Sequence, residues 1–280
     1  MKIVVTGGTG KAGRWVVSHL REAGYDVLNV DWKHDGSDHG LCLVTDLSDP
    51  GQAFEALAGA EGVVHLAAIP APELRPAAET FRINMLSTYN VFAAAEAHGV
   101  GRMVYASSET VLGLPFDEPP AFAPIDEKHP PRPESSYSLA KLAGETLADQ
   151  FTRRTGVPYV GLRISNIMEP QDYQAFPGYW DDPLLRKWNL WGYVDARDVA
   201  AAVEQALTAD VAGHEIAIIA AADTCMTRES TDLMAEVYPG VRLTREVRGH
   251  ETLLAIDRAR EVLGYEPSHS WRNEVDDPPT

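Results

Sequence analysis

Residues 6–13 read TGGTGKAG, and this stretch decides the fold. The apolar run Ile3–Val5 before it is typical of a buried strand, and residues 14–22 after it have the spacing of an amphipathic helix. Three of the glycines suit a tight turn, a close approach of backbone to a pyrophosphate, and close packing of helix on strand. The first N–H groups of the helix would then bind phosphate. The predicted cofactor contacts in this loop are Gly7, Gly10, Lys11, Ala12 and Gly13.

Acidic residues at the ends of the next two predicted strands bear on the choice of cofactor. Asp31 stands where a carboxylate can bind both ribose hydroxyls of NAD and repel the 2′-phosphate of NADP. Lys33 and His34 follow it and could soften that exclusion, but we expect NAD rather than NADP. Asp46 and Leu47 are predicted to contact the adenine, although Asp46 could instead cap the following helix.

Short apolar runs alternate with helical patterns along the chain. The expected strands are residues 3–5, 27–30, 42–44, 63–66, 103–106, 159–162 and 215–220, and the expected helices are 14–22, 53–57, 80–97, 137–155, 195–206, 228–238 and 258–263. This alternation predicts an α/β fold with a doubly wound parallel sheet of the Rossmann type. Residues 169–189 have no clear period, which indicates a long loop. We expect an NAD-binding domain over 1–163, its sheet completed by parts of 190–222, and a small C-terminal substrate-binding lobe over 164–280.

Composition limits the partners and the compartment. The 280 residues carry a formal net charge of −17, whereas a nucleic-acid binder needs a basic surface and anionic membranes would repel an acidic one. No apolar run approaches the ~18 residues of a membrane span, and no signal peptide precedes the first strand. We therefore expect a cytoplasmic protein with neither nucleic acid nor membrane as a partner. The two cysteines, Cys42 and Cys225, predict neither a disulfide framework nor a metal site.

A tyrosine and a lysine stand four residues apart near the start of the helix expected over 137–155. Tyr137 and Lys141 therefore lie on one face. A phenol has a pKa near 10, whereas a general base works best near 7, and a lysine ammonium and a positive nicotinamide would lower the phenol pKa. Ser107 and Ser108 follow a predicted strand at the sheet edge where ligands bind in such folds. We predict that Ser108 holds the substrate oxygen while Tyr137 removes its proton.

Together these residues make the chain resemble the extended branch of the short-chain dehydrogenase/reductase superfamily, the NAD-dependent epimerase/dehydratase family. The motifs that carry the resemblance are TGGTGKAG at 6–13, DL at 46–47, HLAA at 65–68, SSETVLG at 107–113, YSLAK at 137–141, LRISN at 162–166, GYVDARDVA at 192–200 and DRAREVLGYEP at 257–267. They span the chain from its start to about residue 272.

The resemblance implies roles for particular residues. Ser108, Tyr137 and Lys141 would be the catalytic triad, with Tyr137 and Lys141 also contacting the cofactor. Leu66, Ala67 and Ala68 would line the cofactor, and a homodimer would form through the helices at 80–97 and 137–155. The predicted substrate contacts are Ser108, Glu109, Asn166 and Arg163. Arg163 could equally brace the sheet edge, and we expect His65 to be a buried, hydrogen-bonded residue rather than a base.

Departures from the family pattern narrow the function. Family dehydratases carry an Asp-Glu pair after the serine, whereas Glu109-Thr110 stands here, so dehydration is not expected. The segment from Asn166 to Trp191 is short, with only Arg186 and Lys187 basic, whereas family members that hold nucleotide sugars usually have a larger insertion. It resembles the corresponding segment of uronate and aldose dehydrogenases. We expect its aromatic side chains to form the loop's own core rather than a sugar platform.

Three functions remain open from the sequence. The first is an NAD-dependent dehydrogenase that oxidises a hydroxyl of a sugar or sugar acid. The second is a nucleotide-sugar 4-epimerase that retains its NAD, which Asn166 favours because it matches a substrate-binding position of sugar epimerases. The third is a non-catalytic NAD sensor, against which the complete triad argues.

Overall fold

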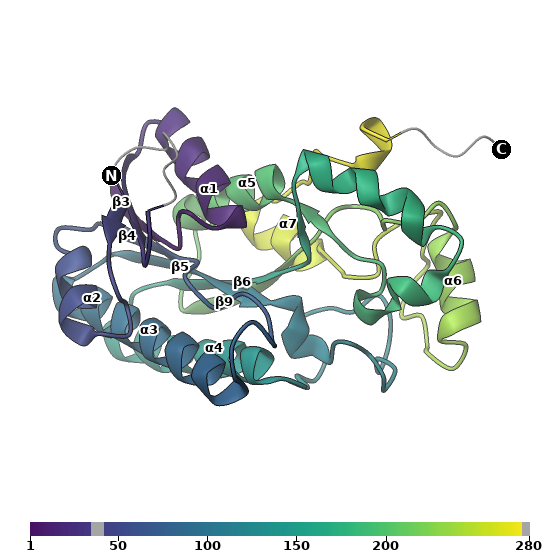
Figure 1. Ribbon diagram of the computed structural model, residues 1–280, viewed down its shortest axis with the longest axis horizontal. Helices are drawn as coiled ribbons and strands as arrows, with labels where there is room; N and C mark the ends of the chain where they lie inside the picture. The colour runs from purple at the N-terminus through teal and green to yellow at the C-terminus, as the bar shows by residue number, and fades with distance from the viewer. Residues whose placement is uncertain (35–41, 276–280) are drawn as a thin grey trace.

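The computed structural model describes residues 1–34 and 42–275 and has a seven-stranded parallel sheet at its centre (Figure 1). The strands lie in the order β3-β2-β1-β4-β5-β6-β9. Their bounds are β1 (Lys2–Thr6), β2 (Asp26–Asp31), β3 (Cys42–Val44), β4 (Gly62–His65), β5 (Arg102–Ser108), β6 (Tyr159–Ile164) and β9 (His214–Ile219). The predicted doubly wound fold is confirmed. The order reverses between β1 and β4, and ligands of such sheets bind outside the carboxyl ends of the strands at this point.

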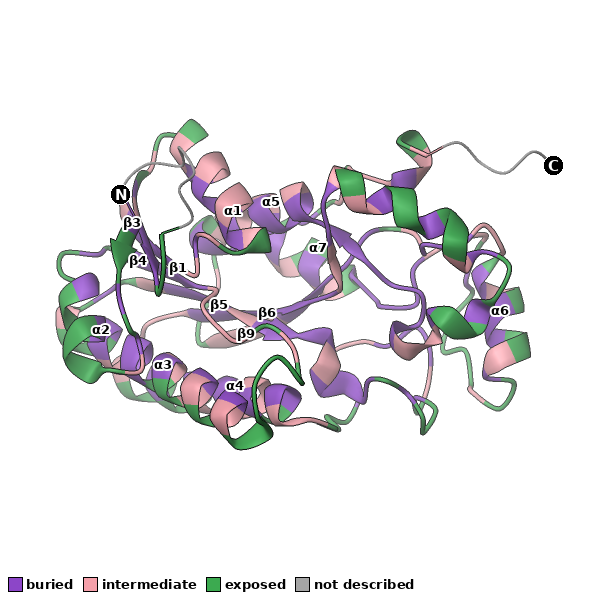
Figure 2. Cartoon of the chain, in the orientation of Figure 1, coloured by how far each residue is buried: buried purple, intermediate pink, exposed green. Residues whose placement is uncertain are grey.

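Helices cover both faces of the sheet. Figure 1 shows α1 (Lys11–Glu22), α5 (Ala196–Thr208) and α7 (Asp257–Leu263) over one face, and α2 (Pro50–Ala56), α3 (Ala77–His98) and α4 (Ser136–Thr155) over the other. Apart from the edge strand β3, where Leu43 and Val44 are exposed, the strands are largely buried from both sides, which is why they read as nearly continuous apolar runs (Figure 2). Within the described ranges, none of the helices combines the length and apolar character needed to cross a membrane.

The lobe beyond β6 is built mainly from short turns. A small parallel pair, β7 (Ile167–Met168) and β8 (Val194–Asp195), brackets three 3₁₀ segments at Pro170–Tyr179, Pro183–Leu185 and Lys187–Asn189. The helix α6 (Ser230–Val237) lies at the far end of the lobe (Figure 1). The strand β9 comes from the region predicted to complete the sheet. The division of the chain at residue 163 stays a prediction, because one hydrophobic cluster runs from α1 and α5 into the lobe.

Aromatic side chains form the core of this lobe. Phe176 is fully buried and makes edge-on ring contacts with Tyr173, Tyr193 and Trp271. Trp191 is also fully buried. The expectation that the aromatic residues of the loop pack as its own core is confirmed for these side chains. Most of the aromatic surface of this loop is therefore buried within the lobe and is not available to stack on a sugar.

Candidate active site

The glycine-rich loop packs so closely on its neighbours that side chains are excluded. Gly7 has a φ of +72°, and a Cβ placed on it would lie 2.6 Å from the backbone nitrogen of Ala67. A Cβ on Gly13 would lie 2.0 Å from the carbonyl oxygen of Gly7. The helix α1 begins after Gly10 without a side-chain cap. The loop thus presents backbone at the start of a helix, which fits the pyrophosphate of a dinucleotide.

Asp31 lies at the end of β2 beside this loop. Its carboxylate accepts hydrogen bonds from the backbone N–H of Thr9 at 3.0 Å and from the Thr9 hydroxyl at 2.7 Å. Asp46 is exposed and accepts from the backbone and hydroxyl of Ser48 at 2.9 and 2.7 Å. The cap of α2 is Asp49, so the alternative of Asp46 as a helix cap is wrong.

The remaining predicted cofactor residues surround the same loop. Ala67 donates its N–H to the Thr6 hydroxyl at 3.3 Å, and Leu66 and Ala68 are half-buried beside it. Lys11, in the first turn of α1, forms an ion pair with a lobe residue rather than standing free: its Nζ lies 2.5 Å from Asp172. The structure therefore brings the glycine loop, the residues after β4 and the lobe together.

The three predicted catalytic side chains meet where β5 ends and α4 begins. A capping box between Ser135 and Ser138 fixes the start of α4. The Tyr137 phenol lies beside the Ser108 hydroxyl, which itself accepts from the Thr110 hydroxyl at 3.0 Å. One helical turn further on, Lys141 donates from Nζ to the carbonyl oxygen of Ala106 at 2.7 Å, and this nitrogen lies 5.6 Å from the centre of the Tyr137 ring.

Burial dominates the electrostatics of this group. The pKa of Tyr137 is raised to about 12, mainly by burial. The nearby Ser108 hydroxyl opposes the rise, and the charge of Glu109 adds to it. Burial also lowers the pKa of Lys141 to about 8. In the protein alone, burial therefore keeps the phenol pKa high, and the lowering predicted from Lys141 together with a positive nicotinamide would need the bound cofactor.

His65 belongs to the support of the site. Its Nδ1 lies 2.8 Å from the Thr6 hydroxyl and its Nε2 lies 3.2 Å from the Thr88 hydroxyl. Burial, together with the charge of Lys141, lowers its pKa to about 3. His65 is thus a neutral, hydrogen-bonded residue, as expected from the sequence.

Glu109 follows Ser108 directly and is buried. Its Oε2 accepts from the Ser165 hydroxyl at 2.6 Å, and its Oε1 accepts from Asn189 Nδ2 at 3.3 Å. Burial raises the pKa of this carboxyl to about 7, and the hydrogen bonds and the charge of Arg186 limit the rise.

Arg186 is a residue that the sequence analysis did not place in the site. It is buried, and its Nη2 donates to the carbonyl oxygen of Gly192 at 3.1 Å. With the Asn166 amide turned to satisfy both residues, the amide oxygen accepts from both Nη atoms at 3.0 and 3.1 Å. The guanidinium carbon lies 5.3 Å from the ring centre of Tyr179 and 4.7 Å from that of Trp188. The available sequence signal was the pair of cations Arg186 and Lys187 in an otherwise acidic, aromatic segment.

Comparison with known proteins identifies the family. The model of the NAD dependent epimerase/dehydratase family matches residues 3–220. The chain belongs to this family. It is 27% identical to a uronate dehydrogenase of Pseudomonas syringae pv. tomato, over 77% of this chain and 72% of the relative. It is 33% identical to an L-arabinose 1-dehydrogenase (NAD(P)⁺) of Haloferax volcanii, over 58% and 66%, and 25% identical to a UDP-glucose 4-epimerase of Corynebacterium glutamicum, over 96% and 92%.

A solved structure gives the same picture. A short-chain dehydrogenase/reductase superfamily protein from Agrobacterium tumefaciens with bound NAD matches with a TM-score of 0.75 and 26% identity. The match covers 97% of this chain and 94% of the other. The relatives therefore include both sugar dehydrogenases and nucleotide-sugar epimerases of the epimerase/dehydratase family.

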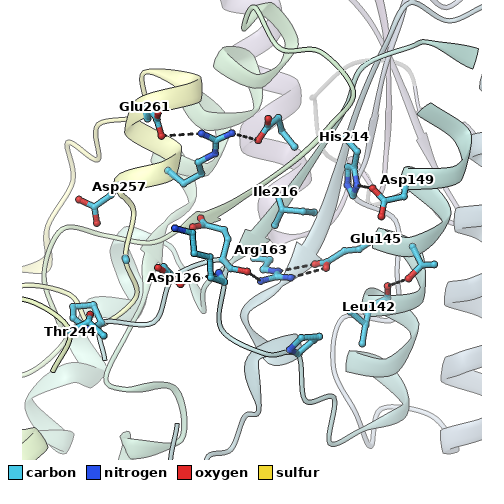
Figure 3. A pocket seen from close by; sticks show the side chains of 18 of the residues that line it. Asp126, Leu142, Glu145, Asp149, Arg163, His214, Ile216, Thr244, Asp257 and Glu261 are labelled. Atoms are coloured by element: carbon cyan, nitrogen blue, oxygen red, sulfur yellow. Dashed lines mark hydrogen bonds and ion pairs between the residues drawn. The ribbon is translucent and has the colours of Figure 1, made fainter. Parts of the chain in front are cut away.

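Within this family member, the contacts of Arg163 favour bracing of the sheet over substrate binding. Its guanidinium donates twice to Glu145, each time at 2.9 Å, and also to the carbonyl oxygen of Glu127 at 3.4 Å. Figure 3 shows this pair in the wall of a cavity of about 890 Å³, beside the hydrogen-bonded pair His214 and Asp149. Ser108, Tyr137 and Lys141 do not line that cavity.

The buried carboxyl of Glu109 makes a prediction for stability. Its pKa of about 7 lies above the ordinary value of 4.5, so the folded state holds a proton that the unfolded state releases between pH 4.5 and 7. Stability should therefore fall as the pH rises through this window, by at most about 3 kcal/mol from this group. Glu109→Gln should remove that part of the pH dependence.

Urea unfolding at pH 5 and pH 8 measures the effect. Glu55→Gln is the matched control, because Glu55 is exposed. The same change in unfolding free energy between the two pH values for the wild type and Glu109→Gln would contradict the assignment.

Proposed function

We propose that this protein is an NAD-dependent dehydrogenase that oxidises a hydroxyl group of a free sugar or sugar acid. The observation that carries the proposal is the meeting of Ser108, Tyr137 and Lys141 at the end of β5. In the proposed reaction the Ser108 hydroxyl holds the substrate oxygen, and the Tyr137 phenolate takes the proton from it. Lys141, held on the Ala106 carbonyl, keeps its ammonium beside the ring.

The cofactor would complete this arrangement. When bound, NAD would supply the acceptor for the hydride and a positive ring that would favour the Tyr137 phenolate, which burial in the protein disfavours. The glycine loop would hold the pyrophosphate, and Asp31 would hold the adenosine ribose. Only glycine fits at positions 7 and 13, and the absence of side chains there would let the pyrophosphate approach the backbone, which supports this placement.

The lobe favours a free sugar over a nucleotide sugar. A nucleotide diphosphate needs cations along an accessible wall, whereas Arg186 is buried and Lys187 lies 4.0 Å from Asp117. The sugar dehydrogenases among the relatives agree with this choice. The second candidate is a nucleotide-sugar 4-epimerase with retained NAD, which the position of Asn166 beside Glu109 and the epimerase relative favour. A non-catalytic NAD sensor would have no use for the complete triad.

A substrate screen tests the proposal. Purified protein supplied with NAD and a panel of aldoses and uronic acids is expected to release NADH with at least one of them. Tyr137→Phe should lower kcat by about 10²–10⁴-fold, because the proton acceptor is lost, while NAD binding is retained.

The alternatives give different results in the same screen. Copurified NAD with interconversion of UDP-glucose and UDP-galactose, and no net NADH, would establish the epimerase instead. Full activity of Tyr137→Phe on the natural substrate would exclude the proposed proton transfer. Binding of NAD without turnover of any sugar would favour the sensor.

Asp31 predicts the preference for NAD over NADP. Asp31→Asn keeps an acceptor for the Thr9 hydroxyl but removes the negative charge that would repel a 2′-phosphate. The ratio of kcat/KM for NADP to that for NAD should rise by roughly tenfold or more. Glu55→Gln is the control and should leave the ratio unchanged, since Glu55 is exposed and is not among the predicted cofactor contacts. An unaltered ratio in Asp31→Asn would show that cofactor choice lies elsewhere.

We also propose a homodimer through α3 and α4, whose outer surface carries apolar side chains. Leu86 is 39% exposed, Tyr89 is 50% exposed and Leu139 is 47% exposed. Such side chains on two neighbouring helices suit contact with a second copy of the chain. Size-exclusion chromatography with light scattering should give a dimer for the wild type and a monomer for a Leu86→Glu, Tyr89→Glu double variant. A monomeric wild type, or an unchanged dimer in the variant, would contradict this interface.

A further inference from the structure

A buried cation without an ionic partner lies next to the proposed catalytic centre. Arg186 is 6% exposed, yet no carboxylate within residues 1–34 and 42–275 lies within 4.0 Å of its nitrogens. Buried arginines are normally paired, because an isolated charge is costly to remove from water. The two aromatic rings beside the guanidinium and the Asn166 amide offset only part of this cost.

The compensating charge belongs to Glu109 and acts through shared hydrogen bonds. Asn189 Nδ2 donates both to Glu109 and, at 2.8 Å, to the Gly192 carbonyl oxygen that Arg186 also uses. We call Glu109, Ser165, Asn166, Arg186 and Asn189 the Glu109–Arg186 cluster. When Glu109 is ionised, its negative charge balances the positive charge of Arg186, and the cluster as a whole is neutral.

Two buried polar atoms of the cluster, one a donor and one an acceptor, are without an oxygen or nitrogen partner among the described residues, although the Cys225 thiol also lies beside the guanidinium. Arg186 Nε and Asn189 Oδ1 are buried and lack a hydrogen-bond partner within the described part of the chain. A hydroxyl group both donates and accepts, so hydroxyls suit such a pair, whereas a carboxylate or phosphate oxygen only accepts. A water molecule can serve these atoms in the free protein, and a sugar hydroxyl would replace it.

The cluster is also placed to meet substrate. Glu109 directly follows Ser108, and its charge contributes to the raised pKa of Tyr137, so it lies near the phenol. Asn166, at the end of β6, is only half-buried and joins the cluster to the surface. A sugar whose reacting hydroxyl lies between Ser108 and Tyr137 would therefore turn other hydroxyls toward these residues.

We propose that the Glu109–Arg186 cluster makes the enzyme select neutral aldoses over uronic acids and sugar phosphates. This rests on the dehydrogenase function proposed above. A neutral sugar leaves the charge of the cluster balanced and can use its donor and acceptor. An anionic group would gain from Arg186 but would be opposed by Glu109, and the loss of its hydration would remain uncompensated.

Matched substrates and two opposite substitutions test the selection. The kcat/KM ratio of glucose to glucuronate, and of galactose to galacturonate, is measured at pH 8, above the pKa of about 7 of Glu109. In the pair that contains the sugar with the higher kcat/KM, the wild type should favour the neutral sugar over the uronic acid at least about tenfold. Glu109→Gln leaves Arg186 uncompensated and should lower the ratio about tenfold or more, whereas Arg186→Gln should raise it. Glu55→Gln is the control and should leave it unchanged.

The opposite directions separate a role in selection from a structural one. Damage to the fold would lower kcat/KM for both sugars together and would not move the ratio. A wild type that prefers the uronic acids, or a ratio that Glu109→Gln leaves unchanged, would overturn the proposal.

Calorimetric binding of the same sugars to the NADH complex distinguishes this inference from the proposed function. Binding of the neutral sugar without turnover would refute the dehydrogenase but support the selection. Turnover and binding of uronic acids alone would support the dehydrogenase and refute the selection. Absence of binding for every sugar would overturn both.

Discussion

The attachment of α4 to the end of β5 is the constraint on which the site depends. Tyr137, Lys141 and Glu145 are spaced four residues apart on one face of α4. Their side chains contact the last three residues of β5, which are 106–108. Tyr137 lies beside the Ser108 hydroxyl, Lys141 donates to the Ala106 carbonyl oxygen, and Glu145 accepts from the Ser107 hydroxyl at 2.5 Å. Glu145 in turn holds Arg163 of β6. The relative position of phenol and serine is therefore set by a row of polar contacts along one helix face rather than by a loop.

Burying this row has an electrostatic consequence. Desolvation moves the phenol, the ammonium and the imidazole of His65 toward their neutral forms. A site with these properties holds little reactive charge of its own, and a cationic ring brought by a cofactor would shift the balance toward phenolate. Glu109 opposes that shift, whereas Arg186 tempers Glu109. The chemistry of Tyr137 is thus linked to a second polar group that shares the same strand end.

The sequence predicted those features that depend on local order. A parallel sheet that is largely buried on both faces produces apolar runs, so the seven strands of the central sheet were predicted but the short pair β7 and β8 was not. A fixed helical spacing brought Tyr137 and Lys141 to one face. Arg186 was missed because its segment has no period and reaches Glu109 only through the folded lobe. The raised pKa of Tyr137 in the protein alone was not predicted, because spacing reports which groups are neighbours, whereas burial, the main cause of the rise, depends on the complete fold.

Contacts between the lobe and α1 link the two ends of the proposed ligand path. Glu169 accepts from the Trp15 indole N–H at 2.7 Å and forms an ion pair with Arg14, while Asp172 pairs with Lys11. The cations nearest the glycine loop are thereby neutralised by the lobe that bears Arg186. In the proposed NAD complex, the start of α1 would therefore bind phosphate mainly through backbone N–H groups, whose directions are fixed by the helix. Since the same segment contacts α1 and supplies Arg186 and Asn189 to the Glu109–Arg186 cluster, a displacement of it would disturb the proposed cofactor and sugar binding together.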